Sequence, residues 1–229
     1  TKMAPFDNKA ARQAFAYAID RPAILKTAYF NVDTEAQIPI SPALSWVQDP
    51  SFKPYTRDVA KAKSLLATAG LSNVSFTLDT TNAPQSIQIA QLIKDELGEA
   101  GMTVNINLLE FTKQIDNASK HQFQASGFGW SGRIDPDGEI SYTHLHTGGG
   151  NNYGQYSNPQ VDDLLDKARV AQTQDERKPL YLQAMKIVTD DAPWVYINFQ
   201  PTFELNTKKV QNYNLVPDAI IRLDGVWLS

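Results

Sequence analysis

The sequence has 229 residues, of which 42% are hydrophobic and 10% aromatic, and its formal net charge is −4. These values are typical of a folded, soluble domain rather than a disordered or membrane-spanning chain, and the lack of a lysine or arginine run argues against nucleic acid as a partner. The sequence contains no cysteine, which excludes thiolate catalysis, cysteine-ligated zinc and disulfides within it.

The first part of the chain is predicted to be mainly helical. Asp7 is expected to cap a helix that ends at Pro22, and Asp20 to cap a short second helix. Residues 31–56 contain four prolines and few large apolar residues, which indicates an ordered segment without regular structure. Another helix is expected from Asp58, with Gly70 as its C-terminal cap.

A strand–helix–strand unit is predicted next. Residues 74–80 and 103–110 alternate apolar and polar side chains, and a helix from about Pro84 to Ala100, stopped by Gly101, lies between them. Strands connected in this way are most often parallel, with a right-handed crossover. A short helix at 112–119 then leads to a further strand that ends near Gly127.

The remaining elements complete an α/β pattern. After the polar run 131–157, Ser157 or Asn158 is expected to cap a helix, Asp175 to start another, and residues 193–199 to form a strand. We therefore predict an α/β fold with a mixed sheet flanked by helices. Ligands of open α/β sheets bind outside the carboxyl ends of strands, so the stretch GFGWSGRIDPD at 127–137 is the main candidate site.

The residue types in this stretch allow more than one interpretation. Trp130 stands among glycines and either presents a flat apolar face to a ligand or packs in the core. Arg133 either pairs locally with Asp135 or presents its guanidinium to a carboxylate or phosphate. Asp135 and Asp137 first of all indicate a turn, because an aspartate side chain accepts from the backbone that follows it.

Enzyme and metal chemistry are less well supported. The segment GWSGR around Ser131 resembles half of a nucleophile elbow, but Arg133 stands where the last glycine is required. His144 and His146 form an H-x-H pair whose rings would point the same way on an extended segment, yet a third ligand at diagnostic spacing is missing. We predict no catalytic residue, no metal and no cofactor, and the glycine-rich segment 147–156 is expected to be a ligand-facing loop.

Four segments in this order resemble the extracellular solute-binding proteins of peptide and nickel ABC importers, the oligopeptide- and dipeptide-binding protein family. They are PFDNKAARQAFAYAIDRPAIL, PISPALSWVQDPSFKPYTRDVAKAKSLLATAGL, GWSGRIDPDG and YSNPQVDDLLDKA. The resemblance implies a type II periplasmic-binding-protein-like lobe and no catalysis. Family members are about twice as long, with two lobes around the ligand, so residues 1–229 resemble the C-terminal lobe, with 208–229 as its closing segment.

The resemblance also implies a function and its partners. The lobe would capture a short peptide or similar small solute, together with a missing N-terminal lobe, and deliver it to an ABC permease. It would work outside the cytoplasm, in the periplasm or extracellular space, associated with the membrane through the transporter. Nickel or haem capture by the same fold, and a serine hydrolase using Ser131, are the alternatives.

The family pattern carries over to Trp130, Ser131 and Gly132 as lining of the ligand cleft, but it breaks at the next position. Peptide-binding relatives have an aspartate there that pairs with the ammonium of a peptide, whereas this chain has Arg133. Either Arg133 faces the cleft and selects an anion, or the loop turns it outward and Asp135 takes the acidic role. Further cleft candidates, which could instead serve sheet packing or turns, are Asn151, Tyr153, Tyr196 and Asn198.

Overall fold

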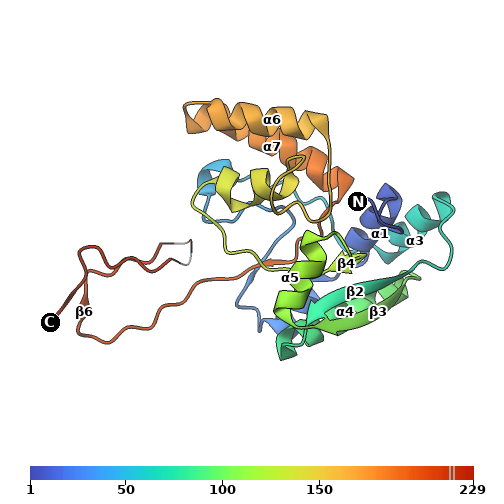
Figure 1. Cartoon of the computed structure of the whole chain (residues 1–229), viewed down its shortest axis with the longest axis horizontal. Coiled ribbons are helices and arrows are strands. Elements are labelled where there is room, and N and C mark those ends of the chain that lie inside the picture. Colours follow the sequence, from blue (N-terminus) through green and yellow to red (C-terminus); the bar gives the residue numbers. More distant parts are fainter. Residues whose placement is uncertain (217, 219) are drawn as a thin grey trace.

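The computed structural model describes residues 1–216, 218 and 220–229, except for the side chain of Ile140. Figure 1 shows a body of helices around a small sheet, with an extended arm at the C-terminus. The long elements, in chain order, are α1 (Lys9–Ala18), α2 (Arg21–Ala28), α3 (Val59–Thr68), β2 (Ser75–Thr81), α4 (Pro84–Glu99), β3 (Thr103–Leu109), α5 (Phe111–Ser119), α6 (Pro159–Val170) and α7 (Gln174–Asp191).

The central sheet has the strand order β3–β2–β4, where β4 is the short strand Ala125–Ser126. Both pairings are parallel, with Phe76 opposite Val104 and Leu78 opposite Ala125. The prediction of a parallel strand–helix–strand unit is therefore confirmed. Since the strands run in the same direction, the segments that follow β2, β3 and β4 leave from one edge of the sheet.

Two hydrophobic cores hold the body together. In the first, side chains of β2 and β3 pack with α1, α3 and α4, and Phe76 meets Phe6 edge to face with ring centroids 4.8 Å apart. The second core lies between α6, α7 and the segment 38–47, and Tyr181 is completely buried in it. The cores are linked by Asp191, which accepts hydrogen bonds from Lys9 of α1 and from Tyr156 and Asn158 before α6.

The helix boundaries follow local capping chemistry. Asp20 caps α2 through its side chain, as predicted, and of the two candidates before α6 it is Asn158 that caps; Asp58, where a helix is expected to begin, caps α3. The prediction for the first helix is wrong by one residue, because the side chain of Asn8, rather than Asp7, accepts from the helix backbone. The start of α7 is also earlier than predicted, because Thr173 and Glu176 form a reciprocal capping box there.

Short elements occupy regions that were predicted differently. The segment 31–56 contains β1 (Thr34–Glu35) and the 3-10 turn η1 (Ser45–Val47), and β1 pairs with β5 (Asn198–Phe199), which is all that forms of the strand predicted at 193–199. The polar run 131–157, for which the sequence predicts no regular element, contains a π-helix, η2 (Asp137–Leu145). Its wide turns lack the 3.6-residue periodicity by which helices are predicted.

The last thirty residues form an arm that leaves the body after β5 (Figure 1). In it β6 (Val210–Gln211) pairs with β7 (Trp227–Leu228) in an antiparallel hairpin. Large apolar side chains along the arm are exposed, among them Phe203 at 77%, Leu205 at 99% and Trp227 at 57%. Two residues of the predicted closing segment 208–229, Pro217 and Ala219, lie outside the described residues.

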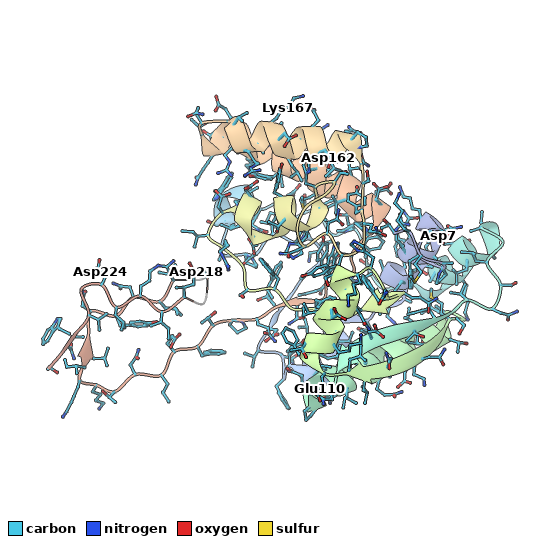
Figure 2. The ribbon with its side chains drawn as sticks, viewed as in Figure 1. Asp7, Glu110, Asp162, Lys167, Asp218 and Asp224 are labelled. Carbon is cyan, nitrogen blue, oxygen red and sulfur yellow. The ribbon has the colours of Figure 1, made fainter. Side chains whose placement is uncertain are left out.

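No helix in the described part of the chain combines the length and the apolar character needed to span a bilayer. Charged side chains are distributed over the surface of the body and of the arm (Figure 2).

Candidate functional site

The loop that carries Trp130 begins where β4 ends, at the carboxyl edge of the sheet. The N–H of Gly127 donates to the carbonyl of Asp79 in β2 at 3.0 Å, which is the last bond of the strand pairing. Gln114 of α5 is 1% exposed, and its amide nitrogen donates to the Gly127 carbonyl at 2.8 Å and to the Ser126 hydroxyl at 2.9 Å. Gln114 thus fixes the point from which the loop departs.

Trp130 is 45% exposed, so half of its indole surface is free to meet a ligand. Its inner edge packs on His144 of η2, with ring centroids 4.6 Å apart and an interplanar angle of 72°, and His144 in turn meets Trp194 at 5.9 Å. Burial of His144 lowers the pKa of its imidazole to about 4, so this ring is neutral at physiological pH. The indole therefore packs on an uncharged aromatic support.

Arg133 lies on the same side of the loop as Trp130. Its Nη1 donates to the carbonyls of Ser131 and Gly132 at 2.8 and 2.9 Å, and the guanidinium carbon is 5.8 Å from the centre of the Trp130 ring. The local pairing of Arg133 with Asp135 considered from the sequence does not occur. Arg133 is exposed beside the indole and, among the described residues, forms no ion pair.

Asp135 is instead bound by Arg177 of α7. Arg177 Nη1 and Nη2 donate to the two carboxylate oxygens at 2.7 and 2.8 Å, and these hydrogen bonds hold the pKa of Asp135 below its usual value. Asp135 also accepts the N–H of Asp137 at 2.9 Å, which is the predicted turn. The sequence alone does not indicate this ion pair, because Arg177 lies 42 positions from Asp135, near the start of a predicted helix.

Gly132 lies directly over a buried carboxyl group. A Cβ at this position would be 3.2 Å from Oε1 of Glu139 in η2, so a side chain here would press on that carboxyl. Ser131 is exposed, and among the described residues its hydroxyl is not hydrogen-bonded to a histidine; the histidine of the aromatic support, His144, has its Nδ1 2.8 Å from the hydroxyl of Thr143. The Ser–His hydrogen bond of an activated serine is thus not formed in the described part of the chain.

The glycine-rich loop returns to the same region. Gly149 passes so close to η2 that a Cβ on it would be 2.5 Å from the carbonyl oxygen of Thr143, and the N–H of Asn151 donates to that oxygen at 2.9 Å. The ring of Tyr153 lies 5.6 Å from that of Phe128, and the Tyr153 hydroxyl donates to the Asn151 side chain at 3.4 Å. Asn151 and Tyr153 are thereby placed beside the loop that follows β4.

Tyr196 and Asn198 are engaged elsewhere. The carbonyl of Tyr196 accepts from the buried Arg21 at 2.7 Å, while its hydroxyl is buried without a hydrogen-bond partner among the described residues, and this burial raises the pKa of the phenol. Asn198 lies in β5, and its side-chain nitrogen donates to Asp33 at 2.6 Å. Neither contact joins them to the Trp130 loop.

The two histidines of the H-x-H pair have different surroundings, because residues 137–145 form a π-helix rather than the extended segment on which the two rings would point the same way. His144 lies in η2, and its ring packs between those of Trp130 and Trp194. The His146 ring stacks on that of Tyr142 with centroids 4.4 Å apart, and its Nε2 lies 3.4 Å from the Asp166 carboxylate. In the described ranges, no three histidine, cysteine or acidic side chains are grouped as a metal site would require.

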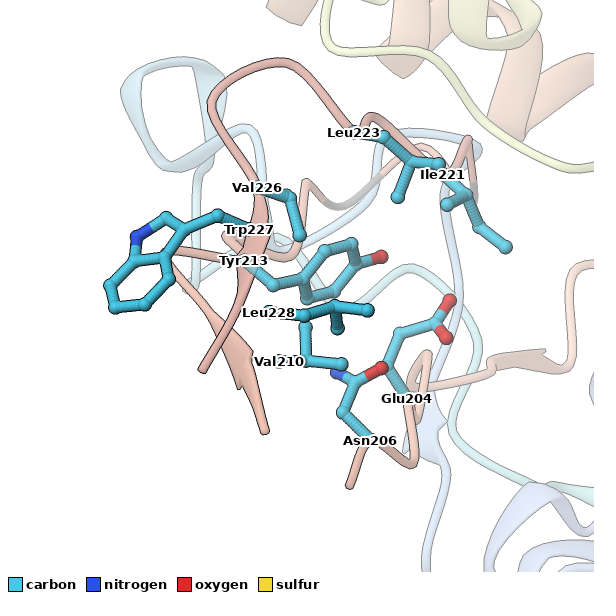
Figure 3. A pocket seen from close by; sticks show the side chains of 9 residues that line it. All are labelled: Glu204, Asn206, Val210, Tyr213, Ile221, Leu223, Val226, Trp227 and Leu228. Carbon is cyan, nitrogen blue, oxygen red and sulfur yellow. The ribbon is translucent and has the colours of Figure 1, made fainter. Parts of the chain in front are cut away.

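A hollow of about 340 Å³ lies on the arm rather than at the strand ends. Figure 3 shows Tyr213, Val226 and Leu228 turned towards one another in it, with Glu204 and Asn206 at one side. All of its lining comes from residues 204–228, so the arm folds back on itself here without touching the Trp130 loop.

Comparison with protein families gives one match over most of the chain. The family model described as bacterial extracellular solute-binding proteins, family 5 Middle, matches residues 1–152. Haem-binding protein A of Haemophilus influenzae is 33% identical over 99% of this chain, and a probable di/tripeptide-binding protein 5 of Pseudomonas aeruginosa is 29% identical over 95% of it. The chain spans 43% and 42% of the lengths of these two relatives.

Solved structures agree in fold. The periplasmic binding protein DppA of Helicobacter pylori, associated with an ABC transporter and solved in complex with the peptide STSA, is 27% identical and matches with a TM-score of 0.87. The match covers 100% of this chain and 45% of that structure. The fold is that of a lobe of a type II periplasmic binding protein, as predicted.

Proposed function

The chain belongs to the bacterial extracellular solute-binding proteins of family 5, and we propose that it is the C-terminal lobe of one of them, which captures a short peptide or similar small solute for an ABC importer. The observation that carries the proposal is the half-exposed Trp130, held on a fixed support at the carboxyl edge of the sheet. In such proteins a ligand enclosed between two lobes stabilises the closed form, because it contacts both lobes only there.

Arg133 determines the charge that the ligand carries in this proposal. Its guanidinium is exposed beside the Trp130 ring, and the carboxylate nearest to it in sequence, Asp135, is occupied by Arg177. A guanidinium binds a carboxylate or another planar anion. We therefore favour Arg133 as the cleft residue that selects an anionic group, and Asp135 as the residue that holds the loop to α7. Ser131, Gly132, Asn151 and Tyr153 line the same side of the cleft.

Tyr196 and Asn198 belong to the proposed site only at its far boundary. Within the lobe, the backbone carbonyl of Tyr196 accepts from Arg21 and the side chain of Asn198 donates to Asp33. They would contact a ligand only if it extends from Trp130 to the β1–β5 pair.

The arm supplies the second part of the proposal, a partner lobe. Its exposed apolar side chains, such as Phe203, Leu205 and Trp227, would be costly in water over such a length. The curated relatives are more than twice as long as this chain, so they hold further residues that could cover these side chains. In the whole protein the arm packs on the N-terminal lobe, outside the cytoplasm, and the closed protein delivers its solute to a membrane permease without catalysing a reaction.

The proposed function is tested with the full-length two-lobe protein by calorimetric titration with di- and tripeptides, each with a free and an amidated C-terminus. We expect the free acid to bind at least tenfold more tightly, which corresponds to about 1.4 kcal/mol for one charged hydrogen-bonding contact. Arg133→Gln should remove this difference, while Arg57→Gln, which removes an arginine bound to Glu99 on another surface, should keep it. Absence of binding to any peptide would refute peptide capture.

Haem is the second candidate solute, because the relative with 33% identity is named a haem-binding protein. His144 is 4% exposed in this lobe and has no access to an iron atom, so a haem would rest on Trp130 and Arg133, with its propionates on the guanidinium. Absorbance titration of the full-length protein with haem separates the two candidates. A complex that survives Arg133→Gln and Trp130→Ala together would contradict this use of the site.

A further inference from the structure

Glu139 is a buried acid directly behind the loop that carries Trp130. It lies in η2 and is 5% exposed. Its Oε1 accepts the backbone N–H of Ser41 at 3.0 Å, across 98 positions of sequence. Its other oxygen, Oε2, is buried and has no hydrogen-bond partner among the described residues. No step of the proposed ligand capture uses this carboxyl group.

The same side chain lies next to Gly132 of the loop. A Cβ on Gly132 would lie 3.2 Å from Oε1 and 3.5 Å from Cγ and Cδ of Glu139, so there is no free space for a side chain between the loop backbone and Glu139. The backbone N–H of Glu139 also donates to the carbonyl of Asp135 at 2.9 Å. Glu139 thus lies between two parts of the lobe. On one side is the 38–44 segment, which belongs to the α6–α7 core, and on the other is the turn from Gly132 to Asp135.

We propose that Glu139 is a positioning residue for the ligand loop, residues 129–133, and that its carboxylate sets where Trp130 and Arg133 lie by holding Gly132 against the Ser41 segment. The link between the carboxylate and the loop is independent of the ligand. Only its effect on affinity rests on the proposed function.

The surroundings of Glu139 make this link depend on its charge. Burial raises the pKa of the carboxyl group to about 7, and the bond from Ser41 only partly opposes this. When ionised, the carboxylate makes a charge-assisted bond with Ser41 that is stronger than the bond of the neutral acid. The proposed position of the loop should therefore shift near neutral pH.

Other ionisable groups lie near Glu139, and burial raises the pKa of Asp137 among them. Of the preceding loop and turn, Arg133 is exposed, Asp135 is paired with Arg177, and Asp137 lies 3.4 Å from Arg169. His144, further along η2, has its pKa lowered to about 4. The segment 38–44, IPISPAL, contains no ionisable side chain.

The chain offers a matched control in α4. Glu96 is 7% exposed, its Oε2 accepts the backbone N–H of Asp20 at 2.9 Å, and burial raises its pKa to about 7 as well. It packs beside α2 and makes no contact with the loop. Glu96→Gln therefore removes a carboxyl group of the same kind from another place.

The test follows the amide signals of Ser41 and Gly132 and the indole N–H signal of Trp130 by ¹H–¹⁵N NMR of this chain between about pH 5 and pH 9. We expect all three to shift with a common midpoint near pH 7, to lose this titration in Glu139→Gln, and to keep it in Glu96→Gln. If Ser41 titrates while Gly132 and Trp130 do not, Glu139 ties down only the 38–44 segment and the proposal is wrong. Absence of any titration also overturns it.

A second measurement connects the loop to binding. In the full-length protein we expect peptide affinity to be roughly threefold to tenfold weaker at about pH 5.5 than at about pH 8.5, and Glu139→Gln to abolish this dependence. Unchanged pH dependence in Glu139→Gln would contradict the positioning role even if the NMR signals titrate. Failure of every peptide to bind, with the three NMR signals still titrating together, would instead refute the proposed function and leave the link between Glu139 and the loop intact.

Discussion

The ion pair between Asp135 and Arg177 is expected to hold the turn that directly follows the ligand loop to α7. A double-mutant cycle can measure its strength. The four proteins are the unmodified chain, Asp135→Asn, Arg177→Met and the double variant. The two bonds of 2.7 and 2.8 Å are charge-assisted, and the arginine side chain is 18% exposed. The carboxylate side chain is 45% exposed, so solvent screens part of the attraction.

The expected coupling energy lies between two limits. Exposed ion pairs contribute up to about 1 kcal/mol, and breaking fully buried ones costs about 3–5 kcal/mol. A bidentate, half-buried pair should therefore give about 2 kcal/mol. The matched control is the pair of Lys167 and Asp163 on α6, whose side chains are 60% and 56% exposed, and which should couple by less than about 0.5 kcal/mol.

The assay is urea unfolding followed by circular dichroism, with the coupling energy calculated from the four free energies of unfolding. The pH dependence provides a second check. Because Arg177 lowers the pKa of Asp135 in the folded state, the stabilisation is present above the unfolded pKa and is lost as pH falls through the lowered value. A coupling no larger than that of the control pair, or one that does not weaken in acid, would refute the ion pair as the anchor of the loop.

Three further predictions concern stability. The pKa values of Glu139 and Glu96 are raised to about 7, so the folded state keeps protons that the unfolded state releases, and the free energy of unfolding should fall as pH rises from about 4.5 to 7. Urea titrations across this range should show a smaller fall in Glu96→Gln; an equal fall would count against the buried acid. Phe76→Ala should cost about 3–5 kcal/mol, because the ring is 2% exposed and packed on Phe6, and a loss below about 1 kcal/mol in the same assay would contradict this packing. Gln114→Ala should cost about 1–3 kcal/mol and speed hydrogen exchange at Gly127, whereas unchanged exchange would show that Gln114 does not secure β4.

Much of the fold could be predicted because its signals are local. The alternation of Phe76 and Leu78 in one segment and of Val104 and Ile106 in another predicts β2 and β3, and Gly70 and Gly101 have the positive φ angles of helix C-caps. The error at α1 is of the same local kind. Asp7 and Asn8 are both good capping residues, and only the extended backbone of Asn8, with φ −87° and ψ 122°, decides between them.

The site was less predictable because its decisive contacts are distant in sequence. The placement of Trp130 after a strand follows from pattern, and so does its neighbourhood of glycines. The partner of Asp135 lies in α7, and the acid beneath Gly132 belongs to a π-helix in a segment that has no helical periodicity. No local rule connects these positions, since they meet only when the sheet and the α6–α7 core are assembled.

The arm has a consequence for how firmly the two proposed lobes are joined. Because it is covalently attached to the body after β5, its docking on a partner lobe of the same protein is a reaction within one molecule, at an effective concentration in the millimolar range for a short flexible link. Each apolar side chain along it can then contribute a weak contact, and the arm still remains bound. In the proposed two-lobe protein, a join made of many weak contacts would tolerate bending, so the lobes would change their angle without separating.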